Sequence, residues 1–322
     1  MDLIDEKILK RIERKFPVSS HPYRDLAKDL RLTEKEVISR LSQLKKKGII
    51  LRIGAFFDSE KLGFHSTLIA MKVPQSRLQE VADIINCYPG VTHNYSRDHQ
   101  FNLWFVLMGK NRKEIDEILK KIKDQTGVNE ILNVPKKQLF KLNLNFTRER
   151  ECFMISQLDK QIIKRLGEDL PLCSQPFKRI AQEIGIEEET LFDKIRQYQA
   201  REWMRRFSAA LNHTSFAAAS TNAMGVWKVA EGRTERVGQL MASFQEVSHC
   251  YERATCPGWE YNLYTMIHTS SKEECERVAA RISQKTGIKE YELLYTCQEF
   301  KKTSPVYFKF VRPLRVDKER RK

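Results

Sequence analysis

Residues that interrupt regular structure are scarce in this sequence, which has 13 glycines and 10 prolines among 322 residues. That scarcity excludes collagen-like and low-complexity chains, which are rich in both residues. Long hydrophobic runs are missing as well, since no stretch approaches the roughly 18 to 20 apolar residues of a membrane-spanning helix. The charged N-terminal segment MDLIDEKILKRIERKF also lacks an apolar signal core. We therefore expect a globular cytoplasmic protein that does not cross a membrane.

Paired cysteine motifs are missing too. The seven cysteines are scattered, odd in number and contain no C-x-x-C pair. This pattern argues against a disulfide framework and against a metal site built by the protein alone. We expect the cysteines to be reduced structural thiols.

Negative charge is in short supply, because the formal net charge is +15. The excess is uneven: residues 1–150 carry 29 basic and 19 acidic side chains, residues 151–300 carry 19 and 21, and residues 301–322 carry 9 and 2. Such a surplus indicates an anionic partner. Nucleic acid, an acidic membrane and a polycarboxylate ligand all satisfy that requirement.

The chain contains an internal repeat. The segment IDEKILKRIERKFPVSSHPYRDLAKDL aligns without gaps with LDKQIIKRLGEDLPLCSQPFKRIAQEI at an offset of 154 residues. Further on, VTHNYSR at 91–97 matches VSHCYER at 247–253, and FNLWFVLMG at 101–109 matches YNLYTMIHT at 261–269. Four extra residues, around Cys256 to Trp259, lengthen the turn in the second copy.

Each repeat begins with a pattern typical of a winged helix-turn-helix. Three short stretches have apolar residues at helical spacing. Thr33 and Glu36 form a capping box that opens the third stretch, and Gly48 ends it. We predict that the wing is a strand pair beginning near Ile49.

The rest of each repeat alternates between strand and helix patterns. In the first copy we predict strands near 65–73, 91–97, 101–108 and 128–136, with helices near 76–86 and 112–126. That order is the ferredoxin-like βαββαβ unit. The fold class is therefore α+β, with expected domains at 1–52 and 151–206 (winged helix-turn-helix), 53–150 and 207–310 (ferredoxin-like), and 311–322 (basic tail).

This domain order resembles the Lrp/AsnC family of transcription regulators, whose members pair through their sheets. Two copies in one chain would form that pair internally, as a pseudo-dimer, while further self-association stays open. The uncovered faces of the two ferredoxin-like sheets would then face each other across a cavity.

Strand alternation places polar side chains on that uncovered face. We predict that Val91, His93, Tyr95 and Arg97 share one face of their strand. The second copy follows the same pattern, with Val247, His249, Tyr251 and Arg253 on one face. On the following strands we expect the uncovered face to show Asn102, Trp104, Asn262 and Tyr264. Burying such polar groups without partners costs roughly 1–3 kcal/mol each. We therefore expect a polar, anionic ligand in the cavity.

The motifs GAFFDSEKLGF, VTHNYSRDHQFNLWF and VSHCYERATCPGWEYNLYTMIH resemble both subunit types of the sirohaem decarboxylases, over about residues 1–310. The resemblance implies a carboxy-lyase that converts sirohaem to 12,18-didecarboxysirohaem, in alternative haem or haem d1 biosynthesis. Sirohaem and its decarboxylated products would be the ligands. No added cofactor is implied, because the iron arrives with the substrate.

The resemblance also suggests roles for individual residues. His93 and His249 would donate protons, since an unperturbed pKa of ~6.5 suits proton transfer. Ligation of the substrate iron by either histidine would be a competing role for the same side chain. Tyr95 and Tyr251 would orient them or relay the proton. Substrate binding is predicted for Arg52, Arg97, His99, Asn102, Trp104, Arg205, Arg206, Arg253, Asn262 and Tyr264.

Two other functions fit parts of the sequence. A DNA-binding regulator would use the helix-turn-helix modules, yet the second recognition helix begins with Glu187, Glu188 and Glu189. Residues 151–200 carry 7 basic and 9 acidic side chains, so DNA binding is disfavoured. A non-catalytic haem sensor or carrier would use the same cavity, and only turnover distinguishes it from the enzyme.

Overall fold

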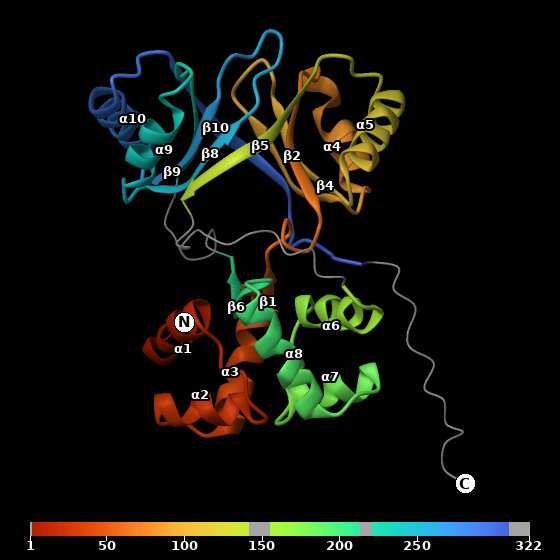
Figure 1. Ribbon diagram of the computed structural model, residues 1–322. Helices are drawn as coiled ribbons and strands as arrows, with labels where there is room; N and C mark the ends of the chain where they lie inside the picture. The colour runs from red at the N-terminus through yellow and green to blue at the C-terminus, as the bar shows by residue number, and fades with distance from the viewer. Residues whose placement is uncertain (1, 142–154, 213–220, 309–322) are drawn as a thin grey trace. The chain divides into compact units, whose positions relative to one another are not determined.

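The computed structural model describes residues 2–141, 155–212 and 221–308 of the chain (Figure 1). The chain divides into two compact units, and each unit contains a part of both repeats. The helical unit comprises residues 1–63, 151–217 and 306–322, and the barrel unit comprises residues 64–150 and 218–305.

The helical unit contains the two helix-turn-helix modules. The first has helices α1 (Leu3–Arg14), α2 (Pro22–Leu30) and α3 (Glu34–Lys46), and the second has α6 (Gln157–Gly167), α7 (Pro176–Ile184) and α8 (Glu188–Ala200). The predicted capping box is confirmed, since the Thr33 side chain accepts a hydrogen bond from the Glu36 backbone and Glu36 reaches back. Gly48 follows the end of α3 with a φ of 68°, a conformation that favours glycine.

The wing strands pair between the repeats, not within each repeat as predicted. Strand β1 (Ile50–Phe57) runs antiparallel to β6 (Met204–Leu211), so it also crosses the boundary expected after residue 52. Gly54 lies opposite Ser208, its own equivalent in the repeat. Each module thus gives its strand to the other, and the pairing places a pseudo-two-fold axis between these two residues.

The barrel unit contains two βαββαβ lobes, as predicted. Lobe 1 consists of β2 (His65–Met71), α4 (Leu78–Asn86), β3 (Val91–Arg97), β4 (Leu103–Gly109), α5 (Arg112–Thr126) and β5 (Ile131–Lys141). Lobe 2 consists of β7 (Thr221–Trp227), α9 (Thr234–Ala242), β8 (Val247–Arg253), β9 (Leu263–Thr269), α10 (Lys272–Thr286) and β10 (Tyr291–Lys302).

The two sheets join into one closed barrel with the strand order β10-β3-β4-β2-β5-β8-β9-β7. The last strand of each lobe makes the closure, because β5 pairs with both β2 and β8, and β10 pairs with both β7 and β3. The predicted pairing of sheets within the chain is therefore confirmed. Figure 1 shows the four helices of this unit outside the barrel, α4 and α5 on one lobe and α9 and α10 on the other.

Three apolar clusters hold the barrel unit together. One lies between sheet and helices in lobe 1, and includes Val81, Ile85, Phe105 and Ile122. A second occupies the same place in lobe 2. The third, which includes Trp104, Tyr264 and Trp259, draws its residues from both lobes and fills part of the barrel interior.

Candidate active site

The two His-Tyr-Arg stripes, which are His93, Tyr95 and Arg97 on β3 and His249, Tyr251 and Arg253 on β8, line the barrel interior. Each stripe begins two residues later than predicted. A β-bulge separates Val91, which pairs with Leu107, from His93, which pairs with Val106. The extra residue moves Val91 to the helix-side core. Val247 moves to the equivalent core of lobe 2 through the same bulge. The prediction that these valines share a face with the histidines is therefore wrong.

Neighbouring contacts fix the direction of the lobe 1 stripe. Asn94 points to the helix side, where its amide donates to Ala82 O and to Asn86 Oδ1. His93 and Tyr95 alternate with it and so face inward, and Tyr95 lies opposite Trp104 of the interior cluster. The aromatic rings of the two stripes are arranged alike, with His93 6.2 Å from Tyr95 and His249 6.0 Å from Tyr251 between ring centroids.

Each stripe arginine binds the opposite lobe. Arg97 of lobe 1 donates from Nη1 to Leu294 O at 2.9 Å and to Thr296 Oγ1 at 3.2 Å, both on β10. Arg253 of lobe 2 donates from Nη1 to Val134 O at 3.1 Å on β5. The strand exchange therefore positions both guanidinium groups at the seams between lobes.

Both arginines keep unsatisfied charge. Arg97 is only 6% exposed, and the Nε atoms of Arg97 and Arg253 are buried without a hydrogen-bond partner. Within residues 2–141, 155–212 and 221–308, neither guanidinium forms an ion pair with a carboxylate. Burial lowers the pKa of Arg97 to about 10 and also lowers the pKa of Arg253. Because an uncompensated buried charge is costly, the interior is suited to an anion.

A hydroxyl group contacts each stripe histidine from the preceding residue. Nδ1 of His93 lies 3.0 Å from Thr92 Oγ1, and Nδ1 of His249 lies 2.8 Å from Ser248 Oγ. The Ser248 hydroxyl also contacts His268 Nε2 at 2.9 Å. These hydroxyls fix the ring orientation, and the two lobes use the same device with different residues.

The pKa of His93 differs from the unperturbed value expected from the sequence. Burial, followed by repulsion from Lys302 and from His249, lowers its pKa to about 4. The imidazole of His93 is therefore neutral at pH 7. Burial also raises the pKa of Tyr95, which keeps its hydroxyl protonated.

Two residues at the site were not predicted to belong to it. Lys302 lies opposite His93 in the pairing of β10 with β3. Trp259 comes from the four-residue insertion in the second repeat. It is 3% exposed and donates from Nε1 to Tyr264 Oη at 2.7 Å. The only sequence signal for the position of Trp259 is that this turn is longer in the second repeat than in the first.

Trp259 is the centre of an aromatic cluster at the Arg97 end of β3. Its ring centroid lies 5.6 Å from Trp104, 5.5 Å from His99 and 5.9 Å from Phe101. His99 also contacts Glu292 through Nε2 at 3.3 Å. Trp104 and Tyr264 thus lie inside the barrel as predicted, but they pack against Trp259 at this end of it.

The remaining predicted binding residues lie elsewhere. Asn102 uses its amide to bind both backbone groups of Val73, at 2.9 and 2.8 Å, and Asn262 does the same with Val229. These two amides therefore tie neighbouring loops together. The other three predicted residues belong to the helical unit, where Arg205 pairs with Asp58 and the guanidiniums of Arg52 and Arg206 lie over the Phe56 ring.

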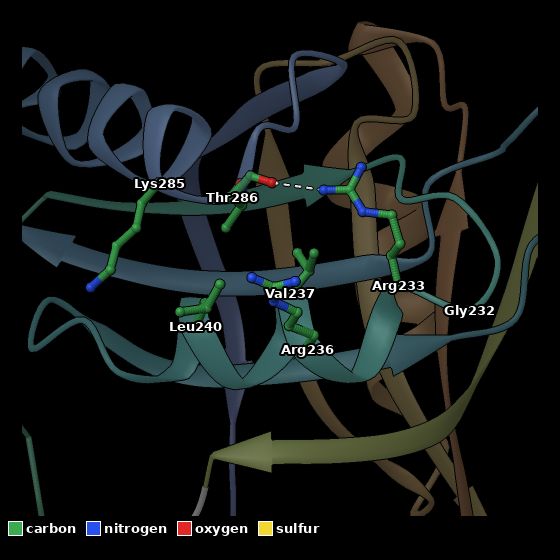
Figure 2. Close-up of a pocket in the computed structure, with 7 residues that line it drawn as sticks. All are labelled: Gly232, Arg233, Arg236, Val237, Leu240, Lys285 and Thr286. Carbon is green, nitrogen blue, oxygen red and sulfur yellow. Dashed lines mark hydrogen bonds between the residues drawn. The ribbon is translucent and has the colours of Figure 1, made fainter.

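A separate basic pocket lies outside the barrel, on lobe 2. Figure 2 shows it at the start of α9, where Arg233 donates to Thr286 O at 3.0 Å. It is lined by Gly232, Arg233, Arg236, Val237, Leu240, Lys285 and Thr286. None of the predicted site residues lines it.

Within the part of the chain that the structure describes, no three or more His, Cys, Asp or Glu side chains are arranged to hold a metal ion. No helix among the same residues has the length and apolar character needed to span a membrane.

Family models match both parts of each repeat. The model described as "AsnC-like ligand binding domain" matches residues 61–141 and 219–301. The model described as "Siroheme decarboxylase NirDL-like HTH domain" matches residues 5–50 and 159–205. The matches follow the two βαββαβ lobes and the two helix-turn-helix modules.

Known relatives match the chain either whole or by halves. The siroheme decarboxylase of Hydrogenobacter thermophilus is 34% identical over 316 residues, covering 94% of each chain. The siroheme decarboxylase alpha subunit of Desulfovibrio desulfuricans is 45% identical over 151 residues, covering 47% of this chain and 87% of that subunit.

A solved structure supports the same assignment. The crystal structure of the siroheme decarboxylase NirDL in co-complex with an iron-uroporphyrin III analogue has a TM-score of 0.73 and 33% identity, covering 95% of this chain and 94% of that one. The closed barrel, the paired stripes and these matches lead to one assignment: the chain belongs to the sirohaem decarboxylase family.

Proposed function

We propose that this chain removes two acetate carboxyl groups from sirohaem and releases 12,18-didecarboxysirohaem, for haem or haem d1 biosynthesis. The observation that carries the proposal is the pair of buried arginines, Arg97 and Arg253, whose Nε atoms lack partners inside the barrel. Peripheral carboxylates of a tetrapyrrole would satisfy both groups through charge-assisted hydrogen bonds.

The chemistry needs only a carboxylate substrate and a proton. In each step the bond between the acetate methylene and its carboxylate breaks, and carbon dioxide leaves. The electron pair stays on the methylene carbon, where the conjugated ring delocalises it. One proton then reaches that carbon and gives a methyl group, so no oxidant or reductant is consumed. We propose no added cofactor, since the iron is part of the substrate.

We assign proton delivery to His93 and His249, with Tyr95 and Tyr251 orienting their rings. His93 is neutral at pH 7 because burial and nearby positive charge lower its pKa. Substrate carboxylates would act in the opposite direction and raise that pKa. Binding would therefore charge the proton donor just before it is needed.

The first experiment is anaerobic incubation of the purified chain with sirohaem, followed by product mass. Two successive losses of a carboxyl group are expected. Tight binding with an unchanged mass would instead mean a sensor or carrier. No binding at all would refute the proposal.

Variants then test the histidines. His93→Asn and His249→Asn should each lower turnover by roughly 100-fold or more, in line with the loss of a general acid. His65→Asn is the matched control, because His65 is exposed at the start of β2 and should leave turnover unchanged. Equal activity in all three variants would overturn the catalytic assignment.

The regulator alternative receives no support from the helical unit. Helix-turn-helix proteins read bases with the N-terminal end of the recognition helix. Here that end of α3 is bound by the other repeat, where Ser174 donates to Glu34 at 2.9 Å. In the same way Ser20 donates to Glu188 of α8, at 3.2 Å. Each module thus contacts the N-terminal end of the other module's recognition helix.

A further inference from the structure

The basic pocket outside the barrel contains three cations. They are Arg233 and Arg236 at the start of α9 and Lys285 near the end of α10 (Figure 2). Among the residues that the structure describes, no Asp or Glu side chain forms an ion pair with any of the three. The pocket therefore holds positive charge that the fold does not compensate.

The equivalent position in lobe 1 is neutralised. An arginine immediately precedes each of the two equivalent helices, Arg77 before α4 and Arg233 before α9. In lobe 1 the third helical residue is Glu80, which accepts from Arg77 Nε at 3.2 Å and from its Nη2 at 2.8 Å. Lobe 2 has Arg236 at that position. An ion pair of the first repeat is thus replaced by two like charges in the second.

The third cation is also specific to lobe 2. Helices α5 and α10 both have 15 residues, and the penultimate one is Gln125 in lobe 1 and Lys285 in lobe 2. Gln125 accepts a hydrogen bond from the Tyr88 hydroxyl at 2.8 Å. The Lys285 ammonium instead lies 5.3 Å from the centroid of the Phe244 ring. Both differences between the repeats therefore add positive charge to the same pocket.

A neighbouring cavity on lobe 2 has a different charge pattern. It shares Arg233 with the basic pocket and is also lined by Lys228, Glu260 and Glu290. Lys228 forms ion pairs with both glutamates, at 2.6 and 3.2 Å. The lysine of that cavity is therefore compensated by carboxylates of the same cavity, unlike the cations of the basic pocket.

The fold holds the basic pocket in shape. Arg233 donates to Thr286 O at 3.0 Å and so links α9 to the end of α10. Val237, which follows Arg236, is buried in the core of lobe 2. The pocket has a volume of about 290 Å³, near the lower end of the roughly 300–1,000 Å³ of small-molecule sites. That volume suits a small ligand.

We propose that this pocket binds a small anion that carries phosphate. A phosphoryl group concentrates up to about two negative charges and three acceptor oxygens in one compact group, which suits three cations around a small cavity better than a single carboxylate does. Arg233 and Arg236 would donate charge-assisted hydrogen bonds to its oxygens, and Lys285 would act as a point charge. The site lies on the outside of lobe 2 and does not depend on the proposed function.

Calorimetric titration of the full chain with inorganic pyrophosphate, at constant ionic strength, tests the proposal. One equivalent per chain is expected at ligand concentrations up to about 1 mM. The absence of binding in that range would overturn the inference. Two equivalents would do the same, because lobe 1 has the neutralised counterpart. Citrate is titrated in parallel, and tighter binding of citrate than of pyrophosphate would refute the assignment to phosphate.

Two variants give lobe 2 the residues of lobe 1. Arg236→Glu recreates the ion pair with the preceding arginine, and Lys285→Gln removes the third charge. Each should weaken pyrophosphate binding by roughly 10- to 100-fold. Lys121→Glu is the matched control, because it makes the same charge change as Arg236→Glu at an exposed position of α5, and it should bind like the parent chain.

Unchanged affinity in both pocket variants would place the anion elsewhere and refute the site. Equal weakening in Lys121→Glu would show that only the net charge of the chain matters, which would also refute it. Thermal unfolding of each variant without ligand verifies that the fold is kept.

Discussion

Arg97 carries a buried charge, and the groups that accept its hydrogen bonds also have other partners. Thr296, which accepts from Arg97, also donates to Asn222 Oδ1 at 2.7 Å. Leu294 belongs to the ladder between β10 and β7. The guanidinium therefore contributes little to the stability of the fold, while its desolvation is unfavourable.

Replacing Arg97 by methionine should therefore stabilise the folded protein. We expect Arg97→Met to raise the free energy of unfolding by about 1–3 kcal/mol, as for other buried charges replaced by apolar residues. Denaturant unfolding measures the change. Arg236→Met, at the exposed pocket, should stay within about 0.5 kcal/mol of the parent. A less stable Arg97→Met variant would show that the arginine serves the fold.

His93 should make stability depend on pH. Its pKa is about 4 in the folded protein and near ~6.5 in the unfolded chain. Above the unfolded value both states are neutral, so the full stability is present. As pH falls from 6.5 toward 4, only the unfolded chain gains the proton, and roughly 3 kcal/mol is lost. Unfolding free energies at pH 7 and pH 4.5 should show a smaller loss in His93→Gln than in the parent chain.

Alternation along the strands was sufficient to predict which residue types face the interior from His93 onward. It failed at Val91 and Val247, because a bulge adds one residue and reverses the faces. A bulge has no sequence signal here. The role of Lys302 was also missed, since a position opposite His93 is fixed by pairing with a distant strand.

Among the elements, the last strand of each lobe determines the architecture. Strand β10 leaves its own sheet to pair with β3, and there Phe300 packs on the helix-side core of lobe 1. Strand β5 does the reverse, with Phe140 packed on the core of lobe 2. Each lobe thus completes its core with one aromatic side chain from the other.

Truncating that side chain should weaken the closure. Phe300 is partly buried, so Phe300→Ala should cost about 2 kcal/mol, less than the roughly 3–5 kcal/mol of a fully buried phenylalanine. Chemical denaturation gives the value. Gln298→Ala, at an exposed position of the same strand, should cost under about 0.5 kcal/mol. Similar losses in both variants would contradict the role given to Phe300.

Helical and strand periodicity predicted nearly every element of the first repeat. Strand β5 is the main difference, since it was expected to end at residue 136 and extends to Lys141. Its last residues pair only with β8 of the other lobe. Periodicity identifies a strand but not its partner, which is why neither this extension nor the wing exchange of β1 with β6 was predicted.

At the scale of the whole molecule, the two repeats behave as two subunits joined end to end. Hydrogen-bonded strands link them in both units, through β1 with β6, β5 with β8, and β10 with β3. Relatives that match by halves carry the names of separate subunits. The covalent link is therefore less important for the fold than the shared strands.

Separately produced halves should consequently reassemble. Co-expression of residues 1–150 with residues 151–322 should give a one-to-one complex, because three strand pairings join the halves. Its melting temperature should rise with protein concentration, unlike that of the intact chain. Size-exclusion chromatography and thermal scans at two concentrations test this. A stable, folded monomer of either half would contradict it.

The closed barrel also has a consequence for synthesis on the ribosome. When the first half has emerged, the edges of β3 and β5 have no neighbours, and such edges are the usual templates for aggregation. Their partners, β10 and β8, are translated later on the same polypeptide. The waiting edges therefore meet their partners at the high effective concentration of a tethered segment. In one fused chain, the time before these strands pair is therefore set by translation of the second half and not by diffusion of a separate subunit.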